Sequence, residues 1–334
     1  MSATTKIKRR LTTIPAIAIA AILLTATLPL WVVGGALFDC ASRRWRCPTI
    51  RLLAFGLGWL WLELAGVSFA ALLWVVGMSR NIPLHYRLQK WWAFNLMRVL
   101  RTTTGLSVSC ENADVLATGP LILLARHASL ADSLVSAWAI LTSGGRPRYV
   151  LKKELLTDPS LDVIGNRLPN YFLDRGAADS AGELAAITKL ASDLHDRDVA
   201  VIFPEGTRSN TAKRAKALAK IAEHDQPRAD KLADLHHLLP PRPAGTLALL
   251  AGAPDADIVV AWHVGFDGLD TFGGILRHLA QAPPPVMFVM RRIPRNTVPT
   301  DPDAAAAWLD DVWLDSDNAV HQTLTQSPYM KDAQ

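Results

Sequence analysis

Two short segments carry the residues with the most evident chemistry in this chain. The first, RHASLAD, places His127 and Asp132 in an H-x4-D arrangement. The second, FPEGTR, runs from Phe203 to Arg208 and combines a carboxylate, a glycine and an arginine. A carboxylate can fix the tautomer of an imidazole and stabilise the cation that the ring becomes on taking a proton. A glycine lets backbone N–H groups approach a ligand, and an arginine can bind an anion. The two segments therefore indicate a base, an orienting carboxylate and an anion clamp.

Each of these segments follows an apolar run with the length of a buried strand. Residues 121–124 precede the histidine segment, and residues 199–203 lead into FPEGTR. An H-x4-D pair occurs often by chance, so a surface histidine with a carboxylate at a helix start is the competing interpretation. A third segment, YFLDRG at 171–176, also ends an apolar strand and lies between the other two. The ordered set favours a reactive site.

Apolar runs and helical patterns alternate along the rest of the chain. The expected elements are strands at 149–151, 170–174, 258–262 and 286–290, and helices at 132–141 and 183–196. Strands that alternate with helices predict an α/β domain with a central, largely parallel or mixed sheet flanked by helices.

The N-terminal region contains two long apolar runs, at 11–38 and 50–78. A membrane-spanning helix needs about 20 apolar residues, and a signal peptide has an apolar core of only about 7–15. We expect residues 1–78 to form a hydrophobic helical hairpin, either as two spans or as a re-entrant hairpin. Residues 79–334 would then form a single domain with a C-terminal helical tail. Glu63, near the middle of the second run, is expected to face its partner helix or water.

The chain has 334 residues, a net charge of +5 and three cysteines. No nucleic-acid motif accompanies the positive charge, so attraction to anionic lipid headgroups is the simpler interpretation. The cysteines show no CxxC spacing, which argues against a disulfide framework and a zinc site. We therefore predict no metal, and a membrane protein whose catalytic domain faces the reducing cytoplasm.

Taken in order, the H-x4-D segment, YFLDRG and FPEGTRS resemble the motif series of the glycerolipid acyltransferases, the family that includes lysophosphatidic acid acyltransferase. YVLKKEL at 149–155 extends the resemblance, and LLPPRPAG at 238–245 and RRIP at 291–294 are similar to the lysophospholipid and lysocardiolipin acyltransferase branch. The resemblance implies transfer of a fatty acyl group from acyl-CoA or acyl carrier protein to a lysophospholipid, without a cofactor. Conversion of lysophosphatidic acid to phosphatidic acid is the simplest reaction, and lysocardiolipin and lysophosphatidylglycerol are alternative acceptors.

The resemblance also assigns roles within the motifs. His127 would act as general base on the acceptor hydroxyl, and Asp132 would orient it. Arg175 and Arg208 would bind a phosphate of the acceptor or of the donor's carrier. A salt bridge with Asp174 is the structural alternative for Arg175.

Other motif residues have less definite roles. Glu205 would position the acceptor or brace an arginine, and Gly206 and Thr207 would donate backbone N–H groups to the polarised carbonyl oxygen. Arg126 stands where the family commonly has asparagine. It either favours neutral His127 and adds charge for an anionic acceptor, or points away. The fourth family block is only loosely matched, and there His263 either faces the site or, as we favour, packs as a strand-end histidine.

Two other functions are open at this stage. A hydrolase would use His127 to activate water, but the chain has no G-x-S-x-G elbow and no evident metal cluster. A non-catalytic lipid-binding scaffold would keep the fold without the reaction, and the intact His127 and Asp132 argue against it.

Overall fold

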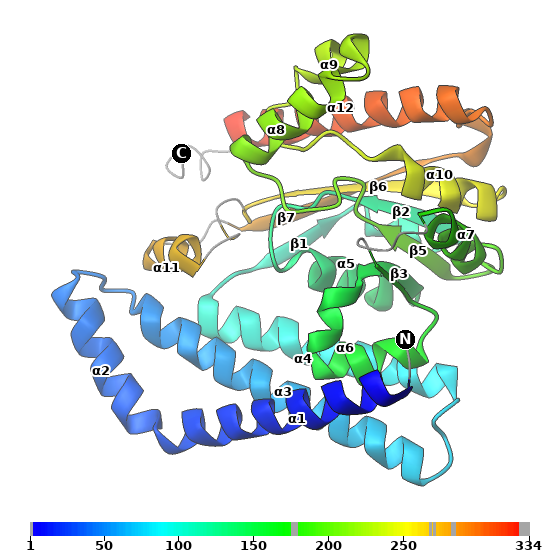
Figure 1. Cartoon of the computed structure of the whole chain (residues 1–334). Coiled ribbons are helices and arrows are strands. Elements are labelled where there is room, and N and C mark those ends of the chain that lie inside the picture. Colours follow the sequence, from blue (N-terminus) through cyan, green and yellow to red (C-terminus); the bar gives the residue numbers. More distant parts are fainter. Residues whose placement is uncertain (1–2, 175–179, 267–268, 270–271, 282–284, 327–334) are drawn as a thin grey trace. The chain divides into compact units, whose positions relative to one another are not determined.

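The computed structural model describes residues 3–174, 180–266, 269, 272–281 and 285–326 (Figure 1). Its contacts divide the chain into two compact units. The first unit contains residues 1–107, 151–175 and 271–283, and the second contains residues 108–150, 176–270 and 284–334.

The first unit is mainly helical. Its elements are α1 (Ala3–Ala26), α2 (Leu28–Ala41), α3 (Pro48–Val75), α4 (Ile82–Thr104), η2 (Lys153–Thr157), α6 (Pro159–Val163), η3 (Gly165–Arg167), β4 (Tyr171–Leu173) and α11 (Phe272–Ala280). The apolar run at 11–38 is therefore not one helix, because α1 ends at Ala26 and α2 begins with a proline in its first turn. A proline is tolerated there, since the first N–H groups of a helix have no partner within it. Helical segments Thr4–Ala26 and Pro48–Val75 are long and apolar enough, by length and composition, to cross a membrane.

Buried carboxylates hold helices of this unit together. Glu63 of α3 accepts hydrogen bonds from Trp92 Nε1 at 3.1 Å and from the Ser160 N–H at 3.0 Å. In these contacts Glu63 meets α4 and α6, whereas the expected partner was the helix of the first apolar run. Asp162 of α6 is fully buried and accepts two hydrogen bonds from the Arg9 guanidinium, at 2.6 and 3.0 Å. The N-terminal helix is thus tied to α6 by a bidentate pair, the geometry that a guanidinium fork favours.

The second unit contains most of the sheet. Its strands are β1 (Val108–Glu111), β2 (Leu121–Ala125), β3 (Arg146–Lys152), β5 (Asp198–Ile202), β6 (Asp257–Val264) and β7 (Val286–Ile293), in the spatial order β1-β7-β6-β2-β5-β3. Its helices are η1 (Ala113–Leu116), α5 (Asp132–Thr142), α7 (Ser180–Ala191), α8 (Thr211–Ala222), α9 (Gln226–Leu232), α10 (Pro243–Gly252), η4 (Arg295–Thr297) and α12 (Pro302–Gln326). The pairs β1–β7, β2–β5, β2–β6 and β3–β5 are parallel, and β6–β7 is antiparallel. The predicted α/β class with a mixed, largely parallel sheet is confirmed.

The register of the three central strands brings their carboxyl ends to one edge. Leu124 of β2 pairs with Ile202 of β5, and Ala125 pairs with Ala261 of β6. All residues of β2 and β5 are buried, which explains why β2 and the part of β5 after Asp198 are uninterrupted apolar runs. The segments that follow β2 and β5, and the last residues of β6, therefore lie together. In open α/β sheets this edge is where ligands bind.

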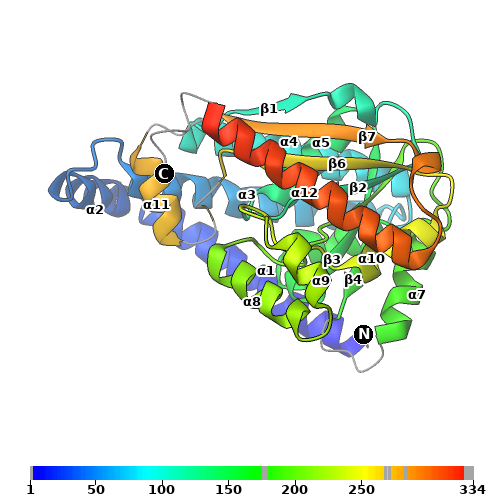
Figure 2. The same cartoon turned by 90° about the horizontal axis from the view of Figure 1, so that it is seen from above.

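Helices cover both faces of this sheet. In Figure 1, α10 and α12 lie on one side of it and α5 on the other, and in Figure 2 α12 crosses the strands at β6 and β7. Trp313 of α12 is completely buried. Strand β1 was not predicted, because it is a four-residue strand whose residues alternate between partly buried and exposed positions and include Ser and Glu.

The contact between α7 and α10 gives a stability prediction. A Cβ added at Gly252 would collide with the main-chain oxygen of Thr188 and lie 2.9 Å from the Ala191 Cβ. Overpacking of this kind costs about 1–3 kcal/mol, so we expect Gly252→Ala to lower the unfolding temperature in detergent by several degrees. Gly273→Ala is the matched control, because nothing lies within 4 Å of its added Cβ. A Gly252→Ala protein that melts at or above the wild-type temperature would contradict this packing.

Candidate active site

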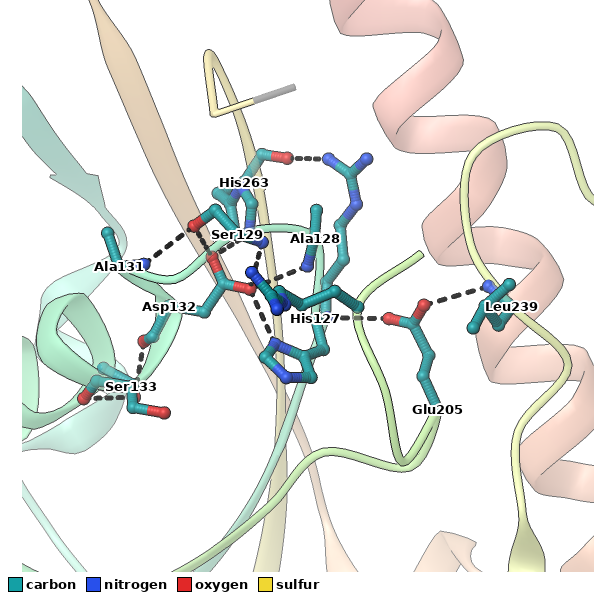
Figure 3. Close-up of polar contacts among 12 residues, drawn as sticks. His127, Ala128, Ser129, Ala131, Asp132, Ser133, Glu205, Leu239 and His263 are labelled. Atoms are coloured by element: carbon teal, nitrogen blue, oxygen red, sulfur yellow. Dashed lines mark hydrogen bonds and ion pairs between the residues drawn. The ribbon is translucent and has the colours of Figure 1, made fainter. Parts of the chain in front are cut away.

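The H-x4-D segment is wrapped around the Asp132 carboxylate. Asp132 is the first residue of α5, and its Oδ2 lies 2.9 Å from His127 Nδ1 (Figure 3). The same oxygen accepts the main-chain N–H groups of Ala128 at 2.7 Å and Ser129 at 2.8 Å. The Ser129 hydroxyl donates to Oδ1. The turn from β2 into α5 is thus built on the carboxylate, and the five-residue spacing is what allows the imidazole to reach it.

This arrangement sets the ionisation of Asp132 and the tautomer of His127. The Asp132 side chain is 1% exposed. Burial alone would raise its pKa, but His263 and His127 outweigh that effect and hold the pKa of this carboxyl well below its usual range. An ionised Asp132 accepts the Nδ1–H of His127, which leaves the lone pair on Nε2. The His127 side chain is 18% exposed, and within the described ranges its Nε2 has no hydrogen-bond partner. His127 is therefore poised to take a proton.

A second histidine contacts the same carboxylate. His263 Nε2 lies 3.0 Å from Asp132 Oδ1, and both side chains are 1% exposed. The favoured expectation, a strand-end histidine that only packs, was incomplete. His263 is packed at the end of β6, and it also faces the site.

The FPEGTR loop lies directly beside His127. The Ser209 N–H donates to the His127 main-chain oxygen at 2.7 Å, and the Phe203 ring lies 4.8 Å from the imidazole, centroid to centroid. Gly206 has a φ of +71° and closes a turn by donating its N–H to the Phe203 oxygen at 2.9 Å. A positive φ is what makes glycine suitable at this position. The N–H of Gly206 is thus engaged in the turn, and the predicted carbonyl-polarising role fits the neighbouring Thr207 better.

Glu205 braces this loop from inside. The residue is 1% exposed, and its carboxylate accepts the His127 N–H at 2.7 Å and the Leu239 N–H at 3.0 Å. Burial raises the pKa of Glu205 to about 8, although these two hydrogen bonds and the nearby Arg126 charge act in the opposite direction. Both oxygens accept main-chain N–H groups and the Arg126 charge is nearby, so of the two predicted roles this geometry favours the brace over the positioning of an acceptor. The side chain fixes the backbone of the base instead.

The segment that contains Leu239 is itself held by α12. Asp317 accepts the N–H groups of His236 at 2.8 Å, His237 at 2.7 Å and Leu238 at 2.7 Å. The Arg242 N–H then donates to the Pro204 oxygen at 2.9 Å. A chain of contacts thus runs from the C-terminal helix through Glu205 to the backbone of the base.

The arginines predicted to bind substrate occupy different environments. Arg126 is 2% exposed and donates from Nη1 to the His263 main-chain oxygen, so its guanidinium is directed into the fold. Arg208 is partly exposed and precedes Ser209, the residue bound to His127. Arg175 lies outside the described residues. Among the residues that are described, no group of three or more His, Cys, Asp or Glu side chains could hold a metal ion.

Residues 107–242 match the family model described as Acyltransferase. Residues 107–242 thus have the sequence of an acyltransferase domain. His127, Asp132 and the whole FPEGTR loop lie inside the matched range, and the predicted family and enzyme class are confirmed at this level. The crystal structure of the 1-acyl-sn-glycerophosphate (LPA) acyltransferase PlsC from Thermotoga maritima is similar, with 16% sequence identity, coverage of 80% of this chain and 96% of that chain, and a TM-score of 0.46. No curated protein matches the sequence.

The contacts of three residues that shape the candidate site were not predicted. His263, Leu239 and Asp317 lie outside the H-x4-D and FPEGTR motifs, and each meets the site through tertiary contacts. A usable signal existed only for His263. It ends an apolar strand expected to be parallel to the strand before His127, so both would reach the same edge of the sheet.

The Glu205 brace gives a second prediction. Glu205→Ala would leave the N–H groups of His127 and Leu239 without their acceptor, at a cost of about 1–3 kcal/mol for each buried donor. We expect a lower unfolding temperature in detergent than for the wild-type protein. Glu223→Ala is the control, because Glu223 is exposed at the end of α8. Equal unfolding temperatures for the two variants would show that Glu205 is not a brace.

Proposed function

We propose that the chain is a membrane-bound O-acyltransferase that moves a fatty acyl group from acyl-CoA or acyl carrier protein to the free hydroxyl of a lysophospholipid. Lysophosphatidic acid is the favoured acceptor and phosphatidic acid the product. The observation that carries the proposal is the His127–Asp132 pair, with Nδ1 bound to a buried carboxylate at 2.9 Å and Nε2 left as the basic nitrogen. Its location inside an acyltransferase domain supports the reaction class.

In the proposed reaction, His127 Nε2 takes the proton of the acceptor hydroxyl while the oxygen attacks the thioester carbonyl carbon. The carbonyl π electrons move to oxygen, and the Thr207 N–H is the candidate donor to that oxyanion. When the intermediate collapses, the C–S bond breaks and the thiolate takes the proton from the His127 imidazolium. The products are an ester and a free thiol. Asp132 remains ionised throughout and stabilises the imidazolium.

The N-terminal helices support a membrane-bound enzyme. The acceptor and the product are lipids, and α1 and α3 have the length and composition of membrane helices. We propose that they hold the enzyme at the bilayer, either as two spans or as a re-entrant hairpin, with the catalytic residues on the cytoplasmic side. The reduced cysteines Cys40, Cys47 and Cys110 agree with that side.

The reaction is tested by giving membranes that contain the protein labelled acyl-CoA or acyl carrier protein with a panel of lysophospholipids. We expect acceptor-dependent incorporation of label into phospholipid. His127→Ala and Asp132→Asn should each lower kcat by about 10²- to 10⁴-fold, because they remove the base or its orientation. His224→Ala and Asp234→Asn are the matched controls, since both residues are exposed.

The other outcomes separate the competing functions. Full activity in His127→Ala would refute the mechanism. Release of free fatty acid without dependence on an acceptor would indicate a hydrolase, and inactivity with every donor would favour a lipid-binding scaffold.

A further prediction concerns the anion clamp. We expect Arg208→Gln to raise the KM of one phosphorylated substrate by about 10- to 100-fold with a smaller effect on kcat, because a charge-assisted hydrogen bond is lost. The substrate whose KM rises identifies the phosphate that Arg208 holds. Arg197→Gln is the control, since Arg197 is exposed next to the opposite end of β5. Unchanged KM values for both donor and acceptor would remove Arg208 from the binding site.

A further inference from the structure

The Asp132 carboxylate has two imidazole neighbours, and only His127 is explained by the proposed reaction. Figure 3 shows both rings reaching the same carboxylate. His127 meets Oδ2 at 2.9 Å, and His263 Nε2 meets Oδ1 at 3.0 Å. His263 is 1% exposed, so it is not placed to touch a substrate itself. Any role that it has in the reaction must act through Asp132.

His263 connects the Asp132 carboxylate to a second element of the sheet, which the turn between β2 and α5 cannot do. The other groups bound to the carboxylate, from His127, Ala128 and Ser129, all belong to the same short segment as Asp132. They could move together with it. His263 belongs to β6, and among the described contacts of this carboxylate it is the one that comes from a different strand. It therefore fixes the carboxylate relative to the sheet.

The His263 ring is held firmly enough for this purpose. Its strand pairs with β2 through Ala261 and Ala125, and with β7 through His263 and Phe288. The imidazole packs edge-on against Phe266, with 5.3 Å between the ring centroids. Strand pairing on both sides and an aromatic neighbour restrict the ring to one orientation.

The contact between His263 and Asp132 is closed to solvent. Both ring nitrogens of His263 are buried, and within the described part of the chain neither makes a well-aligned hydrogen bond. Nε2 nevertheless lies 3.0 Å from Asp132 Oδ1, within ion-pair distance. On the other side, the Arg126 guanidinium donates to the His263 main-chain oxygen.

We propose that His263 is a positioning residue: its Nε2, which lies 3.0 Å from Asp132 Oδ1, holds in place the carboxylate that orients His127. This inference rests on the proposed acyl transfer. His263 lies outside the residues matched to the acyltransferase family model.

The test compares His263→Leu, which removes the donor, with His263→Gln, whose amide can still donate to the same oxygen. We expect the leucine variant to lower kcat for acyl transfer by about 10- to 100-fold, with the KM of the acceptor within about twofold of wild type. The glutamine variant should recover most of the loss. In an Asp132→Asn background, His263→Leu should cost no further activity, since residues that act as a unit are not additive.

Val264→Ala controls for a general effect on the core. Val264 is buried next to His263 on the same strand, so the variant loses core volume without touching Asp132. Its kcat per folded molecule should stay near wild type. A leucine variant as active as wild type, a glutamine variant as impaired as the leucine one, or a further loss in the Asp132→Asn background would each overturn the proposal.

A structural measurement separates this proposal from the proposed function. In a crystal structure of His263→Leu we expect the Asp132 carboxylate to rotate and its contact with His127 Nδ1 to lengthen beyond hydrogen-bond distance. In His263→Gln the contact should be retained. If Asp132 and His127 keep their places in the leucine variant, the positioning role is wrong, whatever substrate the enzyme uses. A wild-type protein without acyl-transfer activity would instead contradict the proposed function.

Discussion

The site depends on the Asp132 carboxylate. It is almost completely buried, and it binds His127, two main-chain N–H groups and the Ser129 hydroxyl, with His263 at ion-pair distance. A buried charge is costly unless it is paired and hydrogen-bonded. Here the same contacts that satisfy the charge also set the turn between β2 and α5, the tautomer of His127 and the placement of α5 against β6. Local structure and chemistry therefore have a common origin in one side chain.

The surrounding loops follow the same physical rule. Glu205 accepts the N–H groups of His127 and Leu239, and Asp317 accepts three successive N–H groups from residues 236–238. Loops lack the regular hydrogen bonds of helices and strands, so buried acidic side chains supply the acceptors instead. One carboxylate thus holds the ring of His127, a second holds its backbone, and a third holds the segment that binds the second. This accounts for a rigid site on irregular segments.

The features that could be predicted from the sequence are those set by residues close together along the chain. Strands at 121–124 and 199–203 read clearly because they are buried on both faces, and the H-x4-D contact spans only five residues. The contact of His263 with Asp132, the N–H groups that Glu205 accepts and the role of Asp317 were not predicted, because these partners are set by strand register and helix packing. The pairing of Ala125 with Ala261 places His263 beside Asp132. The sequence near residue 263 indicates only that an apolar strand ends there, not this register. For Arg126, two orientations were open, and the structure places its guanidinium on the His263 main chain.

The central claim is that Asp132 acts through His127, and a double-mutant cycle tests it most directly. Acyl-transfer rates would be measured for the wild-type enzyme, the two single variants His127→Ala and Asp132→Asn, and the double variant. The account predicts that Asp132→Asn lowers the rate by about 10²- to 10⁴-fold when His127 is present, and has no measurable further effect when it is absent. A double variant whose loss is the product of the two single losses would show that Asp132 acts independently of His127, and would contradict the account.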